Sequence, residues 1–362
     1  MDFPKYDGNI HPDDWINDIQ KYFILKPISN INNDRLKAAI LSVDFNISLP
    51  TGIDNYEKLR NALKEDISFT IFKNTNKRKL QSLKYIPENR GGDTSNFIST
   101  FRKLCYNAEI NDIEVQKKYL YKSLPMNYFD SISNEFNKKM KNINSINDLI
   151  KEFEDFVIDL SNFIINDSIV ALKHIATGKY LSSIENLCYT TGSCTQSVFV
   201  GSPEPGPNSL WRIKFNKELA TCADTSITLQ HIKSNKSLGI IYNSYYTICD
   251  YIKSPLTRHT EVSCNDINNI HGYSKWSGNW KFNHSKLQNH QGYLKSNDII
   301  NLSINKEYQN GPDVFLRSHD VQFTIGNDTF QEVVCHNERI GGNDEWCIEL
   351  FKQYIWTADT II

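Results

Sequence analysis

The sequence lacks a long apolar run: no stretch approaches the about 18 consecutive apolar residues that a membrane-spanning helix needs. It also lacks an excess of one charge, because 40 Lys and Arg residues stand against 42 Asp and Glu residues, for a net charge of −2. A balanced chain creates no overall field that would attract nucleic acid or an anionic membrane. The first residues, Met1 to Lys5, do not form the charged and then apolar leader of a secreted protein. We therefore expect a cytoplasmic protein with no membrane span.

Sequence motifs for phosphate, metal or cofactor binding are also missing. No GxGxxG or GxxxxGK[ST] pattern occurs and the cysteines form no Cys-x-x-Cys unit, so we expect neither a cofactor nor a metal ion. Cys335 and His336 are adjacent, and adjacent side chains on a strand point to opposite faces, which excludes them as a nucleophile and base pair. The spacing of Cys188 and Cys194 leaves open whether they form a disulfide. We predict that the chain is not an enzyme.

The first half of the chain has apolar residues at helical spacing. After the start signal Pro12-Asp13-Asp14, Trp15 and Ile19 follow at i and i+4 of one helix face. Similar apolar stripes recur up to Leu160, and short polar or Gly/Pro-containing segments separate them. We predict an all-α domain of six to eight helices at 1–162.

After about residue 162 the apolar period changes to two, as in strands with one buried face. A threefold repeat begins there, and each unit opens on two alternating apolar residues and closes on a tryptophan. The opening pairs are Val170 and Leu172, Ile227 and Leu229, and Ile300 and Leu302, and the closing residues are Trp211, Trp280 and Trp346. No unit can bury its own apolar face, so the three must close on one another around these core residues. We predict an all-β β-trefoil at 163–355 and a short tail at 356–362.

Two further positions recur within the units. The matching leucines are Leu181, Leu238 and Leu316, and the matching strand residues after them are Val200, Cys264 and Cys335. We expect both cysteines to pack inward, because a valine takes the same position in the first unit. His174 and His231 share a position with Ile304, so we expect structural histidines there rather than metal ligands.

The residues of this repeat resemble a known domain family. The segments 170–183 and 331–346, with the shorter stretches Ser318-His319-Asp320 and 290–294, are similar to the MIR domain. That trefoil occurs in protein O-mannosyltransferases, in inositol-trisphosphate and ryanodine receptors, and in small endoplasmic-reticulum proteins of the stromal-derived-factor type. The resemblance covers roughly 165–350 and implies a recognition module for a glycan or a protein.

The first half resembles the capsid-type domain of retrotransposon Gag proteins. The resemblance rests on Phe3–Gly8 followed by Pro12–Ile16, on Leu80–Leu83 before Phe97–Leu104, and on Lys122–Pro125. The tryptophan usual in the middle of that family is missing here. The resemblance implies a homo-oligomer formed through the helical domain, or binding of another protein.

Two companions of Gag proteins are absent from this chain. It has neither the Asp-Thr/Ser-Gly motif of an aspartic protease nor a Cys-x2-Cys-x4-His-x4-Cys zinc knuckle. The basic triplet Lys77-Arg78-Lys79 is expected to be a solvated helix face. We therefore do not expect nucleic acid as a partner.

Candidate ligand-binding residues lie in the long loops of the second unit and at three later positions. They are Tyr251, Arg258, His271, Tyr273 and Trp276, which suit stacking and hydrogen bonding to a sugar, and Lys295, Arg317 and His319, which suit an anionic group. The loop residues are equally compatible with folding over the end of the barrel. The residues two before the closing tryptophans, Ser209, Gly278 and Asp344, do not match the Gln-x-Trp motif of ricin-type lectins.

These observations favour a non-enzymatic binding or adaptor protein. The helical domain would mediate self-association or partner binding, and the trefoil would recognise a ligand or protein. Two alternatives stay open, a glycan recognition module of mannose type and a retroelement capsid remnant that packages RNA.

Overall fold

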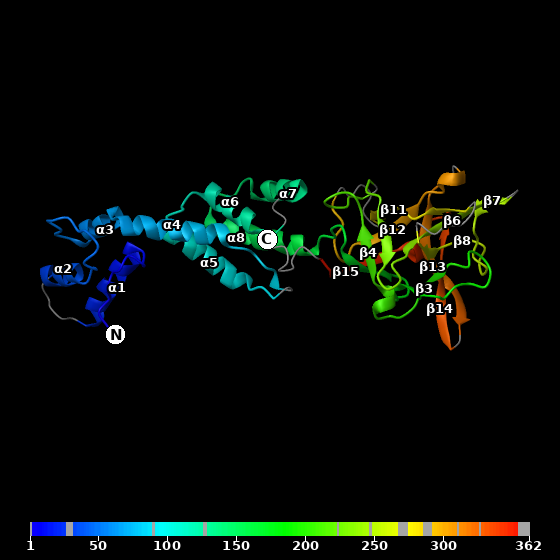
Figure 1. The fold of residues 1–362 in the computed structure, drawn as a ribbon, viewed down its shortest axis with the longest axis horizontal. Coiled ribbons are helices and arrows are strands. Elements are labelled where there is room, and N and C mark those ends of the chain that lie inside the picture. The colour runs from blue at the N-terminus through cyan, green and yellow to red at the C-terminus, as the bar shows by residue number, and fades with distance from the viewer. Residues whose placement is uncertain are drawn as a thin grey trace. The chain divides into compact units, whose positions relative to one another are not determined.

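The structure is a computed structural model that divides into two compact units, Met1–Val157 and Ile158–Ile362, here called the helical unit and the β unit (Figure 1). The described residues are 2–26, 32–88, 91–125, 129–222, 224–245, 248–266, 274–284, 292–309, 311–325 and 327–353. Helices come first along the chain and strands follow, which confirms the predicted two-part layout. Among the described residues, no helix has both the length and the apolar character needed to cross a membrane.

Eight helices lie in the described part of the first half, in agreement with the predicted six to eight. They are α1 Pro12–Leu25, α2 Asn32–Leu41, α3 Tyr56–Glu65, α4 Ile67–Ser82, α5 Thr94–Asn107, α6 Ile113–Ser123, α7 Asp130–Met140 and α8 Ile146–Asn162. The division between the two units falls within α8. Figure 1 shows α4 extending from the group of α1, α2 and α3 to the group of α5, α6 and α8.

Short polar side chains fix where the helices begin. The amide of Lys58 donates to Asn55 before α3, that of Asn96 to Asp93 before α5, and that of Glu114 to Asp112 before α6, each at 2.8 Å. Each cap satisfies a backbone donor that has no partner within the helix. Helix α1 begins differently, because His11 accepts from the amide of Asp13 and Pro12 occupies the first position, where no amide is needed.

The predicted apolar stripes form the interior of the helical unit. Trp15 and Ile19 of α1 are buried with Tyr6 and with Leu59 of α3 in one apolar cluster. A second aromatic group forms where Phe97 of α5 stacks on Phe153 of α8, with ring centroids 5.7 Å apart, and Tyr85 meets both rings edge-on.

The β unit contains a sheet of 15 strands, all paired antiparallel. They are β1 Ile169–His174, β2 Leu181–Ser183, β3 Gln196–Val200, β4 Trp211–Lys214, β5 Thr228–His231, β6 Ser237–Tyr245, β7 Ile248–Tyr251, β8 Thr260–Glu261, β9 Ser263–Asn265, β10 Ser274–Ser277, β11 Trp280–His284, β12 Ile299–Ile304, β13 Val314–Ile325, β14 Asp328–His336 and β15 Trp346–Lys352. The sheet order runs β3-β9-β6-β5-β4-β1-β15-β12-β13-β14, and β14 also pairs with β3. These strands therefore form a closed ring.

The same hydrogen bond occurs three times inside this ring. The indole nitrogen of Trp211 donates to the carbonyl of Leu181 at 3.0 Å, Trp280 to Leu238 at 2.9 Å, and Trp346 to Leu316 at 3.1 Å. All three tryptophans are fully buried, as are the predicted core residues Leu172, Leu229 and Leu302. Each bond joins the two positions that the sequence repeat had matched.

The strand register follows the same threefold pattern. Each of the three leucines lies opposite the residue that the repeat assigned to it, in the pairs Leu181 and Val200, Leu238 and Cys264, and Leu316 and Cys335. His174 and His231 lie opposite Trp346 and Trp211, and Ile304 lies opposite Trp280. The Nε2 atom of each histidine donates to a backbone carbonyl, of Asn343 and of Asn208. These histidines therefore take part in the packing of the repeat.

Replacing Trp280 with alanine should lower the free energy of unfolding of the β unit by about 3–5 kcal/mol, because a fully buried indole leaves a cavity and an unpaired carbonyl. Chemical denaturation followed by circular dichroism measures this loss. Phe351→Ala is the matched control, since that ring lies 43% exposed at the end of β15. Equal unfolding midpoints for Trp280→Ala and the unchanged protein would contradict the assigned role.

Candidate functional site

Tyr251 had been expected as an exposed loop residue, and this expectation is wrong. It ends β7, which pairs with β6, so that Tyr251 lies opposite Tyr242 and is only 1% exposed. The two rings meet at 5.2 Å, and the hydroxyl of Tyr251 accepts from the amide of Tyr308 at 3.3 Å. The ring therefore belongs to the core of the β unit and is not available to a sugar.

The other predicted loop residues have different surroundings. His271 and Tyr273 lie outside the described residues. Arg258 is exposed in the turn between β7 and β8, where its backbone has a φ of 67°. Trp276 of β10 is half-buried, and its ring lies so close to Gly239 that a Cβ atom there would sit 2.7 Å from it. Such a Cβ atom would also lie 2.1 Å from the backbone oxygen of Ser277, so a glycine at 239 allows β10 and this indole to approach β6 closely.

The three residues predicted to bind an anion are engaged within the β unit. The ammonium of Lys295 lies 3.0 Å from Asp159 and 5.2 Å from the ring centroid of Phe163. Arg317 forms two hydrogen bonds to Asp344, at 3.0 and 3.2 Å, and is mostly buried. His319 lies 2.9 Å from a carboxylate oxygen of Glu332. The structure therefore pairs these side chains with carboxylates instead of bringing them together around a ligand.

Asp344 is a fully buried carboxylate with three kinds of donor around it. His336 donates to Oδ1 at 2.7 Å, the amide of Gly341 donates to Oδ2 at 2.7 Å, and Arg317 contacts both oxygens. Burial alone would raise the pKa of Asp344, but the hydrogen bonds from these groups outweigh it and lower the pKa below its ordinary value. Ser209 holds the matching place in the first unit, where the amide of Gly206 donates to its hydroxyl. Asp344 therefore accepts a hydrogen bond from the amide three residues before it, as Ser209 does, but with a charged carboxylate in place of a neutral hydroxyl.

Two further carboxylates, Glu332 of β14 and Glu261 of β8, are also buried. Glu332 accepts from His319 and from the hydroxyl of Ser254, and Glu261 accepts from the amide and hydroxyl of Ser193. Burial would raise the pKa of Glu332, but its donors lower it overall. Burial raises the pKa of Glu261, and the negative charge of Glu332 adds to that increase. Among the described residues, no group of three or more His, Cys, Asp or Glu side chains is placed to hold a metal ion.

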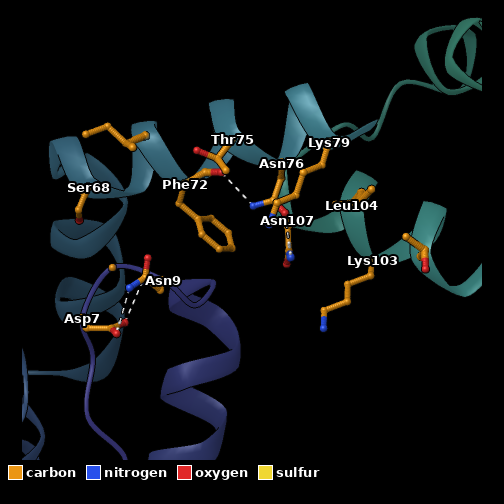
Figure 2. A pocket seen from close by; sticks show the side chains of 13 residues that line it. Asp7, Asn9, Ser68, Phe72, Thr75, Asn76, Lys79, Lys103, Leu104 and Asn107 are labelled. Atoms are coloured by element: carbon orange, nitrogen blue, oxygen red, sulfur yellow. Dashed lines mark hydrogen bonds between the residues drawn. The ribbon is translucent and has the colours of Figure 1, made fainter. Parts of the chain in front are cut away.

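The helical unit contains the cavity that the sequence analysis missed. It has a volume of about 660 Å³, within the range typical of ligand pockets. Its lining comes from the segment before α1 and from α4 and α5 (Figure 2). The lining residues are Asp7, Gly8, Asn9, Ser68, Ile71, Phe72, Thr75, Asn76, Lys79, Thr100, Lys103, Leu104 and Asn107. The only sequence signal was the triplet Lys77-Arg78-Lys79, whose last residue faces this cavity.

A smaller cavity of about 370 Å³ adjoins the first one. The two share the lining residues Asn9, Phe72, Lys103 and Asn107. The smaller cavity is also lined by His11, which is buried and whose ring lies 4.6 Å from that of Tyr106. Burial lowers the pKa of His11, so its imidazole is neutral at pH 7.

Ion pairs near the cavities join α1 to α3, α4 and the turn after α5. The ammonium of Lys64 lies 2.9 Å from Asp13 and 3.0 Å from Glu109, and Lys73 lies 3.1 Å from Glu109. Burial would raise the pKa of Glu109, but the two lysines lower it below its ordinary value. The network therefore connects α1, α4 and the end of α5, the elements that also contribute lining residues to the two cavities.

Comparison with known proteins gives no match to a family model and none to a curated protein. Solved structures with a similar arrangement include the SDF2-like protein from Arabidopsis thaliana, at 23% identity over 51% of this chain and 94% of that chain, with a TM-score of 0.41. A Caenorhabditis elegans protein of unknown function matches at 21% identity over 52% of this chain and 96% of its own, with a TM-score of 0.40. The S. cerevisiae O-mannosyltransferase Pmt1-Pmt2 complex matches at 15% identity over 73% of this chain and 44% of that chain, with a TM-score of 0.42.

The lowered pKa of Asp344 predicts a pH-dependent stability. The ionised carboxylate stabilises the fold at neutral pH, and this contribution is lost as the pH falls below about 4, through the lowered pKa. Asp344→Asn should therefore cost on the order of 3 kcal/mol at pH 7, and the difference from the unchanged protein should shrink below about pH 4. Urea unfolding at a series of pH values measures both effects.

The control for this experiment is Asp328→Asn, which removes an exposed carboxylate from the same unit. It should leave stability nearly unchanged at every pH. If Asp344→Asn unfolds like Asp328→Asn at pH 7, the buried carboxylate does not stabilise the fold as argued.

Proposed function

We propose that this chain is a non-enzymatic binding protein. Its helical unit, of the capsid type, mediates self-association, and its β unit is a β-trefoil of the MIR type that serves as a recognition module. The trefoil assignment is supported by the threefold hydrogen bond from Trp211, Trp280 and Trp346 and by the matching strand register. Of the segments that carry the MIR resemblance, 170–183 spans β1 and β2, 318–320 lies in β13, and 331–346 runs from β14 to the first residue of β15.

Exposed apolar side chains in the helical unit carry the self-association proposal. Leu41, the last residue of α2, is 85% exposed, and Phe45 in the turn that follows is 91% exposed. Ile24 and Leu25 at the end of α1 are 75% and 67% exposed. Side chains of this size gain about 1.5–3 kcal/mol each when they leave water completely. A second copy of the chain that covered Leu41 and Phe45 would provide that gain.

The chemistry of the buried thiols supports a protein that is not an enzyme. Burial raises the pKa of Cys264 to about 12 and raises that of Cys335 as well, so both stay protonated at neutral pH. His336, the neighbour of Cys335 along β14, donates its Nε2 proton to Asp344 and is not directed at the thiol. Neither cysteine therefore has the properties of a nucleophile.

Glycan recognition of mannose type is the second candidate function of the β unit. It depends on Trp276, a predicted aromatic residue that keeps part of its ring exposed on β10. A partly exposed indole is suited to stack on a sugar ring. Trp276→Phe, which retains a flat ring beside Gly239, should keep the fold while weakening such binding.

Light scattering of the full chain tests self-association. We expect a mass that rises with protein concentration, and we expect Leu41→Ser/Phe45→Ser to shift the protein to a monomer because the apolar contact is lost. The matched control is Ile86→Ser/Ile158→Ser, which makes the same kind of change at two other exposed apolar positions. It should associate like the unchanged protein.

Three outcomes of this measurement would count against the proposal. A strict monomer at all concentrations would exclude self-association, and equal loss in both double variants would exclude the assigned surface. Large particles that contain nucleic acid and dissociate in salt would favour a capsid that packages RNA.

A further inference from the structure

The cavity of about 660 Å³ in the helical unit is built from two helices that present the same three kinds of side chain. Helix α4 contributes Thr75, Asn76 and Lys79, and α5 contributes Thr100, Lys103 and Asn107. Spacings of three and four residues place each set on one helix face. Figure 2 labels five of these six residues, all but Thr100, around the same space, with the segment that holds Asp7 and Asn9 on another side. The cavity is therefore lined with donors from separate parts of the chain.

The lysines of this cavity are available for an anion. Within the part of the chain that the structure describes, neither Lys79 nor Lys103 has a carboxylate within ion-pair distance. Lys64 and Lys73, by contrast, both form ion pairs with carboxylates. The carboxylate of Asp7 also lines the cavity, but it accepts from the amide and side chain of Asn9 at 2.9 and 3.1 Å. The lining thus carries two positive charges and one negative charge that is already hydrogen-bonded.

The amides of the cavity are held in place and have unused hydrogen-bonding capacity. Asn76 is buried and donates through Nδ2 to the carbonyl of Phe72 at 2.9 Å, and Asn107 donates to Oδ1 of Asn76 at 3.4 Å. Each amide group can form up to four hydrogen bonds. Asn107 and Asn9 also line the smaller cavity, so a ligand that extends into it would meet the same amides.

An aromatic ring forms a flat wall shared by both cavities. Phe72 is half-buried and lies nearly parallel to Phe69, at 6.2 Å between ring centroids and 19° between ring planes. Ile71 beside it is 58% exposed and extends the apolar wall. An aromatic wall next to amides and lysines suits a ligand that has both a flat ring and an anionic end.

We infer that this cavity binds a small phosphate-bearing ligand with a flat polar ring, the chemical class of the mononucleotides. Lys79 and Lys103 pair with the phosphate as point charges. Phe72 stacks on the ring, and Asn9 and Asn107 bond to its polar edge. Neither Leu41 nor Phe45 lines the site, so the inference goes beyond the self-association proposed above and does not depend on it.

Calorimetric titration of the full chain with adenosine monophosphate tests this inference. We expect saturable binding at millimolar concentrations or below, and we expect Lys79→Ala/Lys103→Ala to weaken it by roughly tenfold or more. Lys77→Ala/Arg78→Ala is the matched control, because it removes the same charge from exposed positions of the same basic triplet that do not line the cavity. This control should bind like the unchanged protein.

Two further measurements separate the contribution of the ring to binding from that of the phosphate. Inorganic phosphate should compete weakly, and Phe72→Leu should reduce the advantage of adenosine monophosphate over inorganic phosphate while leaving phosphate binding unchanged. Melting temperatures of each variant show that the helical unit is still folded.

Absence of binding to the unchanged protein would overturn the inference. Equal weakening in the Lys77→Ala/Arg78→Ala variant would also overturn it, because binding would then reflect general surface charge. Titration of the Leu41→Ser/Phe45→Ser variant keeps the two proposals apart, since that variant should bind adenosine monophosphate normally whether or not the unchanged protein associates.

Discussion

The hydrogen bond from a buried indole to a leucine carbonyl is the contact on which the β unit depends. It joins the last strand of a repeat to an earlier one, and Trp211, Trp280 and Trp346 each make it. A tryptophan buried without a partner for its N–H would cost free energy, so the bond fixes both the depth of the ring and the strand that it contacts. Repeated three times, it sets the register of the surrounding strands and allows β14 to pair back onto β3.

The three repeats share this packing but differ in the polar groups placed around it. The first two use His174 and His231 to bond backbone carbonyls, and the third has Ile304 at that position. The third repeat instead concentrates charge, with Asp344 held by Arg317 and His336 where the first repeat has the neutral Ser209. A buried carboxylate needs several donors to stay ionised, which explains why the charged side chains of this repeat are already paired.

The sequence was sufficient to predict the helices, the three repeats and their core residues, because these depend on periodicity along the chain. It was insufficient for the side chains whose environment depends on distant segments. Tyr251 is buried because β7 folds back on β6, and Arg317 is occupied because Asp344 lies beside it in space. The cavity of the helical unit was missed for the same reason. Residues near positions 8, 75 and 103 line it together, and no pattern within a single segment of the sequence predicts that distant segments line one cavity.

Two of the three core positions opposite the leucines hold a cysteine, Cys264 or Cys335, and the third holds Val200. Both thiols are buried in the interior of the ring of strands. A reagent in solution reaches such a thiol only while the strands around it are separated. The rate at which each thiol is alkylated therefore reports on the opening of its own repeat. The chain thus carries internal reporters that distinguish whether its second and third repeats open together or one at a time.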